Sequence, residues 1–410
     1  MKLRYIFLVF FLVIVMCIST FFIMKPENID TLTCVSCNNL SYVSEGHKTI
    51  LYWNSFFEDR NFNMGEGFIA EHCPVYNNCY AMNWRYAQSH EKFDAILFHG
   101  IDRELNDKDL PKKRSSEQKY IFMTLESPAN RWISSKFNDY FNATMTYKLD
   151  SDITWTYADI VDKTQRVIVP AARENIHWKS TTEMEATTAA TSLDAEAESR
   201  LDALINGKRK LAVWYRSNCI TPSAREKYVE EFERYANVDK FGSCSSNKGC
   251  PRGQDCFKTQ IEPEYFFYLS FENSLCIDYV TEKFFDALKH YVVPVVYGGA
   301  NYSQFAPPKS YINALDFNSP KDLGQYLLTL SQKKTEYKKY FAWKKFYRVE
   351  SPIKRVICDL CKFLNKKTRR SYDISEWFSI NSCPIQRKLT NQYIKNQISY
   401  ATKKTLNEKS

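Results

Sequence analysis

Histidine is scarce in this sequence: only six of the 410 residues are histidine, and none lies at a metal-ligand spacing from either Cys-x-x-Cys pair. Structural zinc sites take cysteine and histidine ligands at short, fixed spacings, so this pattern disfavours zinc. Internal repeats are absent as well, which excludes a repeat architecture. With 44% hydrophobic residues the chain is globular, and its length suits about two domains of ordinary size.

A nucleic-acid-binding motif is also missing, although the net charge is +9. Part of this positive excess lies in the tail after Cys383, at Arg387, Lys388, Lys395, Lys403, Lys404 and Lys409. We interpret the excess as a solvated basic surface and expect no nucleic-acid partner. A mildly basic balance also suits an anionic ligand.

One long apolar run is present near the start of the chain. Residues 6–24 are 19 uncharged and mostly apolar positions, about the length that a bilayer core needs. Lys2 and Arg4 precede the run, so we expect residues 1–5 to stay cytosolic and the bulk of the chain to be translocated. The alternative is a cleavable signal peptide, whose apolar region is usually only about 7–15 residues long. The length therefore favours an uncleaved signal anchor.

Cysteine is plentiful, with twelve cysteines outside this apolar run. An even number in a translocated domain favours disulfides. Two pairs have the Cys-x-x-Cys spacing, Cys34 with Cys37 and Cys358 with Cys361. N-glycosylation tripeptides, which are typical of the same compartment, begin at Asn39, Asn142 and Asn301.

Apolar stretches separated by polar ones predict an α/β fold. Strands are predicted at 49–57, 93–100, 119–127 and 166–171 in the first half, and at 211–217, 265–272, 292–299 and 310–317 in the second. Between 172 and 210 the composition shifts to Ala, Glu and Thr, which predicts a helix and linker closed by Gly207. Alternating strands and helices are typical of crossover units and a parallel sheet.

The predicted organisation follows from these boundaries. It comprises a cytosolic tail (1–5), a transmembrane anchor (6–24), a stem (25–47), an N-terminal domain (48–207), a C-terminal domain (208–365) and a C-terminal extension (366–410).

Three helix starts are predicted in the second half. Thr221 is the expected N-cap of one helix, with Pro222 at its first position. Another helix is predicted from about Thr281 to Lys289. A third is predicted to begin at Ser319, which an acidic residue follows three positions later.

The stretch FENSLCIDYVTEKFF, residues 271–285, places polar groups where a buried strand turns into a helix. Glu272 and Asn273 follow the strand, and Glu282 and Lys283 lie in the first turn of the helix. An open α/β sheet binds phosphates at this kind of junction. Lys283 opposes the helix dipole there, which an anion between the two would explain. The alternative is a surface ion pair between Glu282 and Lys283.

The segment 267–317 resembles the donor-binding signature of the α1,3-fucosyltransferases, which use GDP-fucose. Its sequence is FYLSFENSLCIDYVTEKFFDALKHYVVPVVYGGANYSQFAPPKSYINALDF. The resemblance extends more weakly to FMTLESPAN (122–130), YKLDSDITW (147–155) and SNCITPSAREKYVEEF (217–232). The cysteine-rich segment 244–256 is more similar to invertebrate and plant members than to vertebrate ones.

The resemblance implies a GT-B fold, with two Rossmann-like domains facing across a cleft, and an inverting transfer of fucose to GlcNAc. Glu126, in the LESP segment, matches the family's catalytic base, and Arg225 matches an arginine that contacts the diphosphate. The remaining donor-binding positions are Asn273, Tyr279, Glu282 and Lys283. These residue types suit the reaction: a carboxylate can accept the acceptor's proton, and cations can stabilise the leaving diphosphate.

The resemblance also implies disulfides that join the two domains. Cys358 and Cys361 match the family's late Cys-x-x-Cys, and Cys73 and Cys79 resemble its early partners, so cross-pairing of the two sets is expected. Cys276, inside the donor signature, is either free or paired, and the role of a small buried apolar residue is the preferred expectation.

Two other patterns compete with this assignment. Asp150-Ser151-Asp152 has the Asp-x-Asp form with which many sugar transferases hold a metal, but the resemblance places it outside the diphosphate site. Trp53, Trp84 and Trp132 are candidates for stacking on an acceptor sugar, although core packing is the commoner role of tryptophan.

We therefore expect a single-pass type II protein of the Golgi membrane whose luminal part transfers fucose from GDP-fucose to a glycan on a glycoprotein or glycolipid, with an N-glycan as the first choice. No cofactor is required by this prediction, and a divalent metal is not placed. The alternatives are a transferase that uses another nucleotide sugar and a glycan-binding or chaperone-like relative without activity. Core, antennal and LacdiNAc GlcNAc all remain open as acceptors.

Overall fold

The structure is a computed structural model that describes residues 46–100, 105, 109–171, 176–180, 192–251, 254–367, 370–380 and 382–385. The expected anchor, most of the stem, Cys34, Cys37 and Asn39 lie outside these residues. Within the described ranges, no helix is both long enough and apolar enough to cross a membrane.

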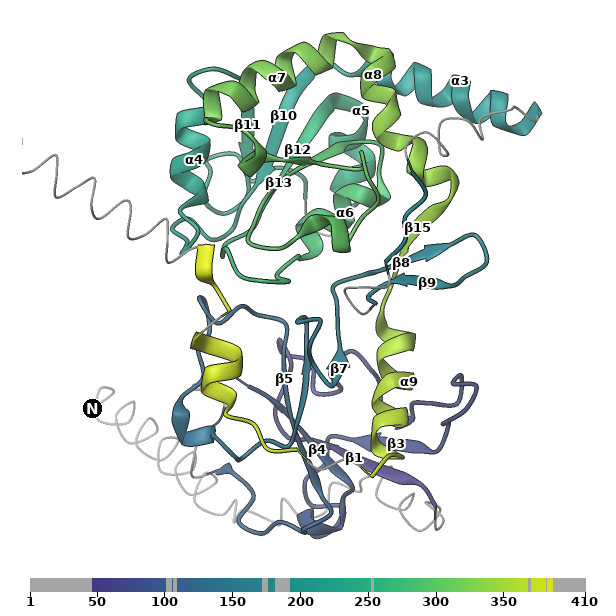
Figure 1. Ribbon diagram of the computed structural model, residues 1–410, viewed down its shortest axis with the longest axis vertical. Coiled ribbons are helices and arrows are strands. Elements are labelled where there is room, and N and C mark those ends of the chain that lie inside the picture. The colour runs from purple at the N-terminus through teal and green to yellow at the C-terminus, as the bar shows by residue number, and fades with distance from the viewer. Residues whose placement is uncertain are drawn as a thin grey trace, which may run out of the picture. The chain divides into compact units, whose positions relative to one another are not determined.

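The first half of the chain forms a sheet of seven strands in the order β2-β3-β1-β4-β5-β6-β7 (Figure 1). All neighbouring pairs are parallel except β2 with β3. The strands are β1 (Lys48–Tyr52), β2 (Gly67–Phe68), β3 (Cys79–Met82), β4 (Ala95–His99), β5 (Lys119–Thr124), β6 (Ala143–Thr146) and β7 (Ile153–Thr154). Parallel pairing brings the carboxyl ends of β1, β3, β4 and β5 to one edge of this sheet.

The second half forms a fully parallel sheet of five strands in the order β11-β10-β12-β13-β14. The strands are β10 (Lys210–Tyr215), β11 (Val238–Phe241), β12 (Tyr265–Phe271), β13 (Val293–Tyr297) and β14 (Ile312–Asn313). Every residue of β12 is buried. A strand covered on both faces needs such a continuous apolar run, which explains why this segment reads as uninterrupted hydrophobic sequence.

Helices cover both faces of the second sheet. The helices of the described part are α3 (Ser192–Gly207), α4 (Arg225–Phe232), α5 (Glu262–Glu264), α6 (Glu282–Lys289), α7 (Pro320–Gln332), α8 (Lys334–Lys338) and α9 (Ile353–Leu364). On one face, α4 and α7 pack with β12 and β13 in a single apolar cluster. Ala287 of α6 packs with Val213 and Tyr268 in another cluster, on the other face.

Two of the three predicted helix starts are confirmed. Thr281 is the N-cap of α6, and the hydroxyl of Ser319 accepts a hydrogen bond from the backbone N–H of Asp322 at the start of α7. The start predicted at Thr221 is wrong. The Thr221 hydroxyl bonds to the Glu226 carboxylate at 2.9 Å instead, and the chain turns once more before α4 begins at Arg225.

A third, antiparallel sheet was not expected. Its order is β15-β8-β9, formed by β15 (Tyr347–Glu350), β8 (Asp159–Asp162) and β9 (Val167–Val169). The strand predicted at 166–171 therefore exists but belongs to this ribbon. Because β15 comes from the C-terminal part of the chain, the ribbon joins segments that are far apart in sequence.

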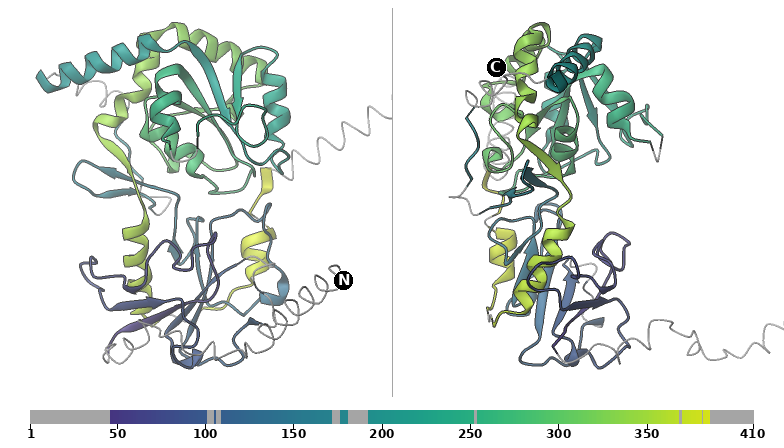
Figure 2. Two further views of the ribbon diagram at one scale, coloured as in Figure 1. Left: turned by 180° about the vertical axis from the view of Figure 1, so that it is seen from behind. Right: turned by 90° about the vertical axis from the view of Figure 1, so that its right-hand side faces the viewer.

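Helix α9 lies beside the first sheet, although the predicted C-terminal domain included it (Figure 2). Arg355 binds both carboxylate oxygens of Asp159 at 2.8 and 2.9 Å and the carbonyl oxygen of Thr154 at 2.8 Å. Disulfides join Cys73 to Cys358 and Cys79 to Cys361. This is the cross-pairing that the resemblance implies. After β15 the chain returns to the first sheet, and the two bridges attach α9 to this sheet.

The expectation for Cys276 is wrong, since it forms a disulfide with Cys383. The segment before Cys383 packs on the first sheet, where Phe378 lies edge-on to Phe122 at 5.1 Å. The bridge therefore links the tail to the donor signature. Further disulfides join Cys219 to Cys244 and Cys250 to Cys256.

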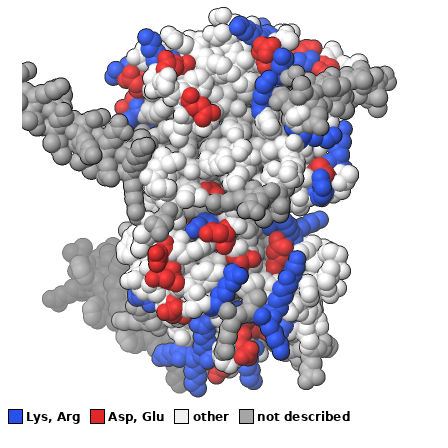
Figure 3. Space-filling model, in the orientation of Figure 1, with Lys and Arg blue, Asp and Glu red and all other residues white. Residues whose placement is uncertain are grey.

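Charges of both signs are mixed on the visible face of the molecule (Figure 3). Lys and Arg side chains there lie among Asp and Glu side chains, and they form no continuous stripe among the described residues of this face. The positive excess is therefore dispersed on that face.

The two bridges to α9 predict a non-additive effect on stability. They close almost the same loop, with sequence separations of 285 and 282, so either one alone still holds the loop closed. In the chain-entropy description, removing the last bridge that closes a loop of this length lowers the free energy of unfolding by roughly 5 kcal/mol. We expect replacement of all four cysteines by serine to lower the free energy of unfolding by more than the sum of the two single-bridge variants. Urea denaturation of the purified, oxidised protein measures these values.

The Cys250–Cys256 bridge provides the control, because its sequence separation is only 6. Its removal should cost about 2 kcal/mol whether or not the α9 bridges are present. Strict additivity of the two α9 bridges would contradict the shared-loop account.

Candidate functional site

The polar residues of the donor signature gather at the carboxyl end of β12. Glu272 follows the strand directly and is fully buried. Its carboxylate accepts hydrogen bonds from the backbone N–H of Thr281 at 2.8 Å and from the Thr281 hydroxyl at 2.9 Å. It therefore satisfies a donor at the start of α6 that would otherwise lack a partner. Burial raises the pKa of Glu272.

Lys283 lies in the first turn of α6 and points back toward this carboxylate. Its Nζ atom lies 2.8 Å from the Thr281 hydroxyl, 2.8 Å from Glu282 Oε1 and 3.5 Å from Glu272 Oε2. Burial and the nearby charge of Arg225 act to lower the pKa of Lys283. The carboxylates of Glu272 and Glu282 outweigh them, and the pKa is raised. Lys283 is thus held as a cation at a helix start, where the helix dipole alone would disfavour one.

Arg225 is the second cation of this neighbourhood. Its side chain is almost fully buried, with 2% of the residue exposed. One guanidinium nitrogen donates to the carbonyl oxygen of Phe271 and another donates to that of Asn218 at 3.5 Å, whereas Nε has no partner. Burial lowers the pKa of Arg225. No carboxylate of the described residues lies within ion-pair distance of this guanidinium, so an anionic ligand would supply a partner.

Arg216, which the sequence analysis did not single out, adds further unpaired donors beside Arg225. Its guanidinium carbon lies 4.8 Å from the Trp214 ring centre, and that of Arg225 lies 5.7 Å from the same centre. The Nε atoms of both arginines and Nε1 of Trp214 are buried without a hydrogen-bond partner in the described part of the chain. Three such N–H groups around one ring are costly to leave unpaired, and they favour a ligand rich in acceptor oxygens.

Glu126 reaches this neighbourhood from the first sheet. It follows the end of β5, is half-buried, and accepts a hydrogen bond from the side-chain amide of Asn130 at 3.4 Å. The next residue, Ser127, donates its hydroxyl to that of Ser274 at 2.7 Å. This contact brings the LESP segment directly against the donor signature, 147 residues further along the chain.

Further contacts join the donor signature to the segment 147–155 of the first half. The Tyr279 ring lies edge-on to that of Tyr147 at 5.0 Å, and the backbone N–H of Leu149 donates to the Asp278 carboxylate at 3.1 Å. Burial raises the pKa of Tyr279, and the charge of Glu126 adds to this effect.

The remaining donor-binding candidates lie at the same junction. Asn273 is 5% exposed, and its side-chain oxygen accepts a hydrogen bond from the Ser274 hydroxyl at 3.3 Å. Glu282 is more exposed and forms the ion pair with Lys283 that the sequence left open as an alternative. The structure thus brings all six predicted site residues into one neighbourhood: Glu126, Arg225, Asn273, Tyr279, Glu282 and Lys283.

Tyr157 is a site residue that carried no sequence signal. Its hydroxyl donates to the carbonyl oxygen of Leu125 at 2.8 Å, directly before Glu126. Burial raises the pKa of Tyr157, and the charges of Glu282 and Glu126 raise it further. A single tyrosine in the short connection between β7 and β8 gives no hint of such a position, because only folding brings it to the carboxylates.

The side chains of the Asp-x-Asp motif have partners outside the donor signature. Asp152 accepts hydrogen bonds from the backbone of Thr144 at 2.9 Å and the Tyr372 hydroxyl at 2.7 Å, and it pairs with Arg370 at 3.0 Å. Asp150 accepts a hydrogen bond from the indole of Trp377 at 3.2 Å. The motif therefore fastens the segment 370–377 to the first sheet.

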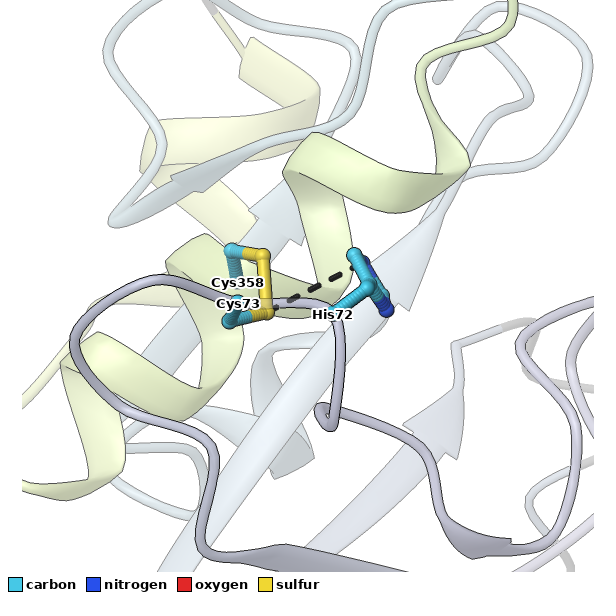
Figure 4. A group of neighbouring side chains, drawn as sticks. All are labelled: His72, Cys73 and Cys358. Atoms are coloured by element: carbon cyan, nitrogen blue, oxygen red, sulfur yellow. Dashed lines mark hydrogen bonds between the residues drawn. A yellow bond between two sulfur atoms is a disulfide. The ribbon is translucent and has the colours of Figure 1, made fainter.

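A cluster of potential metal ligands occurs elsewhere in the described part of the chain, at His72, Cys73 and Cys358 (Figure 4). The two sulfur atoms are bonded to each other. The imidazole Nε2 lies 3.8 Å from Cys73 Sγ and 3.1 Å from the Lys354 carbonyl oxygen. Since sulfur binds metals as thiolate, this oxidised cluster is a structural bridge.

The three tryptophans differ in exposure. Trp53 is 4% exposed and packs in the core, whereas Trp84 and Trp132 are 37% and 61% exposed. The N-glycosylation candidates also differ. Asn142 is engaged by the backbone N–H of Tyr120 at 2.7 Å, and Asn301 is exposed with its side-chain oxygen accepting from the Ser303 hydroxyl at 2.8 Å.

Taken together, the structure is an α/β protein in which cationic side chains gather near the carboxyl end of β12, and Glu126 lies after β5 of the other, mostly parallel sheet. Two family descriptions match the chain: "Fucosyltransferase, N-terminal" over residues 45–158 and "Glycosyltransferase family 10 (fucosyltransferase) C-term" over residues 205–377. The chain belongs to glycosyltransferase family 10, the fucosyltransferases.

Two relatives illustrate the similarity. Alpha-(1,3)-fucosyltransferase C of Drosophila melanogaster is 35% identical over 360 residues, which cover 83% of this chain and 80% of that protein. The 3-galactosyl-N-acetylglucosaminide 4-alpha-L-fucosyltransferase FUT3 of Bos taurus is 33% identical over 297 residues, 70% of each chain. A solved structure of an alpha1,3-fucosyltransferase overlays with a TM-score of 0.49 and 18% identity, covering 79% of this chain and 92% of that one.

The buried carboxylate at the centre of the site predicts a pH-dependent contribution to stability. Because burial raises the pKa of Glu272 above its ordinary value of 4.5, the folded state binds this proton more tightly than the unfolded chain does. The contribution of protonated Glu272 to the free energy of unfolding is therefore fully present below the ordinary pKa. It declines as the pH rises through the raised pKa of the folded state. From about pH 4 to about pH 7, the free energy of unfolding of Glu272→Gln should rise progressively relative to that of the unaltered chain. A difference that does not change with pH would contradict this account.

Proposed function

We propose that the chain is an inverting α1,3-fucosyltransferase with GT-B architecture that transfers fucose from GDP-fucose to GlcNAc of a glycan. The observation that carries this proposal is the contact between the LESP segment and the donor signature, where Ser127 meets Ser274 at 2.7 Å. Family membership supports the transferred sugar, and the names of the relatives support the linkage. Two sheets, one fully parallel and the other parallel except for β2, support the architecture, with Glu126 after β5 of one and Glu272 after β12 of the other.

On the acceptor side, Glu126 acts as the general base. It removes the proton from the attacking hydroxyl as the new bond to the anomeric carbon forms and the bond to GDP breaks. Attack from the face opposite the leaving group inverts the configuration at that carbon. The segment holding Glu126 is fixed by the Tyr157 hydrogen bond to Leu125 and by the Ser127 contact. A positioned base of this kind contributes about 10²–10⁴ in rate.

On the donor side, cations stabilise the charge that develops on the departing diphosphate. Arg225 and Arg216 offer unpaired N–H groups, and Lys283 offers an ammonium that Thr281 and Glu282 hold in place. Asn273, Tyr279 and Glu282 border the same space, with Glu282 toward the ribose. Fixed donors of this kind need no reorganisation when the charge appears, and they act without requiring a metal.

The cellular setting is part of the same proposal. Residues 6–24 anchor the chain in the Golgi membrane, and the described part lies in the lumen with its disulfides intact. Asn301 is the most suitable glycosylation site of the described candidates because it is exposed. Attachment at Asn142 would disturb its hydrogen bonds to β5. An N-glycan is the first acceptor to test.

Replacing the proposed base isolates the chemical step. Glu126→Gln keeps the shape of the side chain but cannot accept a proton, so kcat should fall by about 10²–10⁴ while the Kd for GDP stays unchanged. Initial rates with an N-glycan panel and calorimetry with GDP measure the two quantities. Glu117→Gln, at an exposed glutamate, is the control. Loss of GDP affinity in Glu126→Gln would contradict the role assigned to this residue.

Removing the ammonium of the donor site tests nucleotide binding. Lys283→Ala should weaken GDP binding by about 10- to 100-fold, because a hydrogen bond to a charged group contributes about 1.5–3 kcal/mol. Titration calorimetry with GDP measures the loss of affinity. The difference between the variant and the unaltered chain should be smaller for guanosine, because guanosine lacks phosphate. Lys289→Ala in the same helix is the matched control, since Lys289 pairs with Asp286 on the surface. Equal GDP affinities for Lys283→Ala and Lys289→Ala would contradict the assignment of Lys283 to the donor site.

A further inference from the structure

Two exposed aromatic side chains lie at the carboxyl edge of the first sheet, outside the site described above. Trp84 and Tyr86 follow β3 and are 37% and 82% exposed. They line a cavity of about 380 Å³ together with Asn54, Arg60 and Asn83. Single exposed aromatic residues are common on protein surfaces, but a pair lining one cavity with polar groups is typical of a binding site.

The floor of the cavity is firmly held. Trp53 is 4% exposed, and the guanidinium carbon of Arg85 lies 4.0 Å from its ring centre. Arg85 also donates to the Trp53 carbonyl oxygen at 2.7 Å and to both carboxylate oxygens of Asp109 at 2.7 and 2.8 Å. Asn54 binds the backbone N–H and carbonyl oxygen of His99 at 2.8 and 2.9 Å. A preorganised floor of this kind lowers the entropic cost of binding.

The chemistry of the lining suits a neutral sugar. Aromatic side chains lie beside amide, hydroxyl and guanidinium groups, and none of the residues that line the cavity is Asp or Glu. A sugar ring presents C–H groups that pack on aromatic faces and hydroxyl groups that bond to amides and guanidinium groups. A diphosphate has its partners elsewhere, at the unpaired N–H donors near the end of β12.

Strand register sets the position of the cavity relative to Glu126. Tyr52 of β1 pairs with Leu97 of β4, and His99 of β4 pairs with Met123 of β5, after which the chain reaches Glu126. Neighbouring strands lie about 4.8 Å apart, so the ends of β1 and β5 are roughly 10 Å apart on the same edge. A sugar in the cavity is therefore not the ring that reacts at Glu126, but it can belong to the same glycan.

We propose that the cavity beside Trp84 and Tyr86 binds a neutral sugar ring of the acceptor glycan, remote from the ring that receives fucose. This inference rests on the proposed function, because it takes a glycan as the acceptor. It assigns the choice of acceptor to side chains that follow β1 and β3. Binding energy from such a remote ring helps to hold the reacting ring in place.

Kinetics with a long and a short acceptor test the proposal. In the double variant Trp84→Ala/Tyr86→Ala, the KM for a biantennary N-glycan should rise about 30-fold, because two aromatic contacts to the remote ring are lost together. The KM for the GlcNAc disaccharide, which is too short to reach the cavity, and the KM for GDP-fucose should not change. Tyr326→Ala, at a 38% exposed tyrosine of α7, is the control. Tyr86→Ala alone removes a mostly exposed side chain and so tests the cavity even if Trp84→Ala fails to fold.

Equilibrium binding of the same N-glycan without GDP-fucose separates this inference from the proposed function. If the unaltered chain binds the glycan but transfers no fucose, and the double variant loses binding, the cavity assignment stands and the proposed function fails. Equal glycan binding and equal KM values in the unaltered chain and the double variant would overturn the cavity assignment alone. An equal rise in KM for the long and short acceptors would also contradict it, because the aromatic pair would then contact the reacting ring.

Discussion

The buried carboxylate of Glu272 is the interaction on which the site depends. It ends β12, binds the N–H and hydroxyl groups at the start of α6, and lies 3.5 Å from the Lys283 ammonium. A carboxylate with no access to water is stable only when donors and cations surround it, so the strand, the helix start and the lysine are fixed together. Arg225 lies within the influence of the same charge. A diphosphate bound here would meet cations that are already in place, which is the arrangement that favours the departure of an anionic leaving group.

The C-terminal part of the chain keeps the two sheets together around this site. After β15 the chain returns to the first sheet, where α9 is held by two disulfides and by the Arg355–Asp159 ion pair. The tail then reaches Cys276 through the disulfide to Cys383, inside the donor signature. Asp150 and Asp152 bind this returning segment. The acidic pair that resembled a metal clamp therefore serves the same structural purpose as the disulfides.

Much of the site could be predicted from the sequence because its residues lie in three contiguous segments, 122–130, 217–232 and 267–317. Glu272, Asn273, Glu282 and Lys283 occur within twelve positions, and the change from strand to helix between them is visible in the hydrophobic pattern. Arg216 and Tyr157 could not be found in this way. Their surroundings are formed by strands and loops from elsewhere in the chain, and neither residue lies in a pattern with chemical meaning. The prediction of a helix start at Thr221 was wrong for a related reason. The Thr221 hydroxyl, expected to cap the helix, bonds to the Glu226 carboxylate instead.

The amino-acid sequence by itself determined the alternation of strands and helices, the starts of α6 and α7, and the polar junction after β12. These features depend on neighbours a few residues apart, where periodicity and capping chemistry act directly. Only the tertiary structure decided that Ser127 meets Ser274, that Cys276 pairs with Cys383, that α9 lies beside the first sheet, and that Trp84 and Tyr86 border one cavity. Contacts across 100 or more residues depend on how whole sheets pack, and no local pattern records that packing.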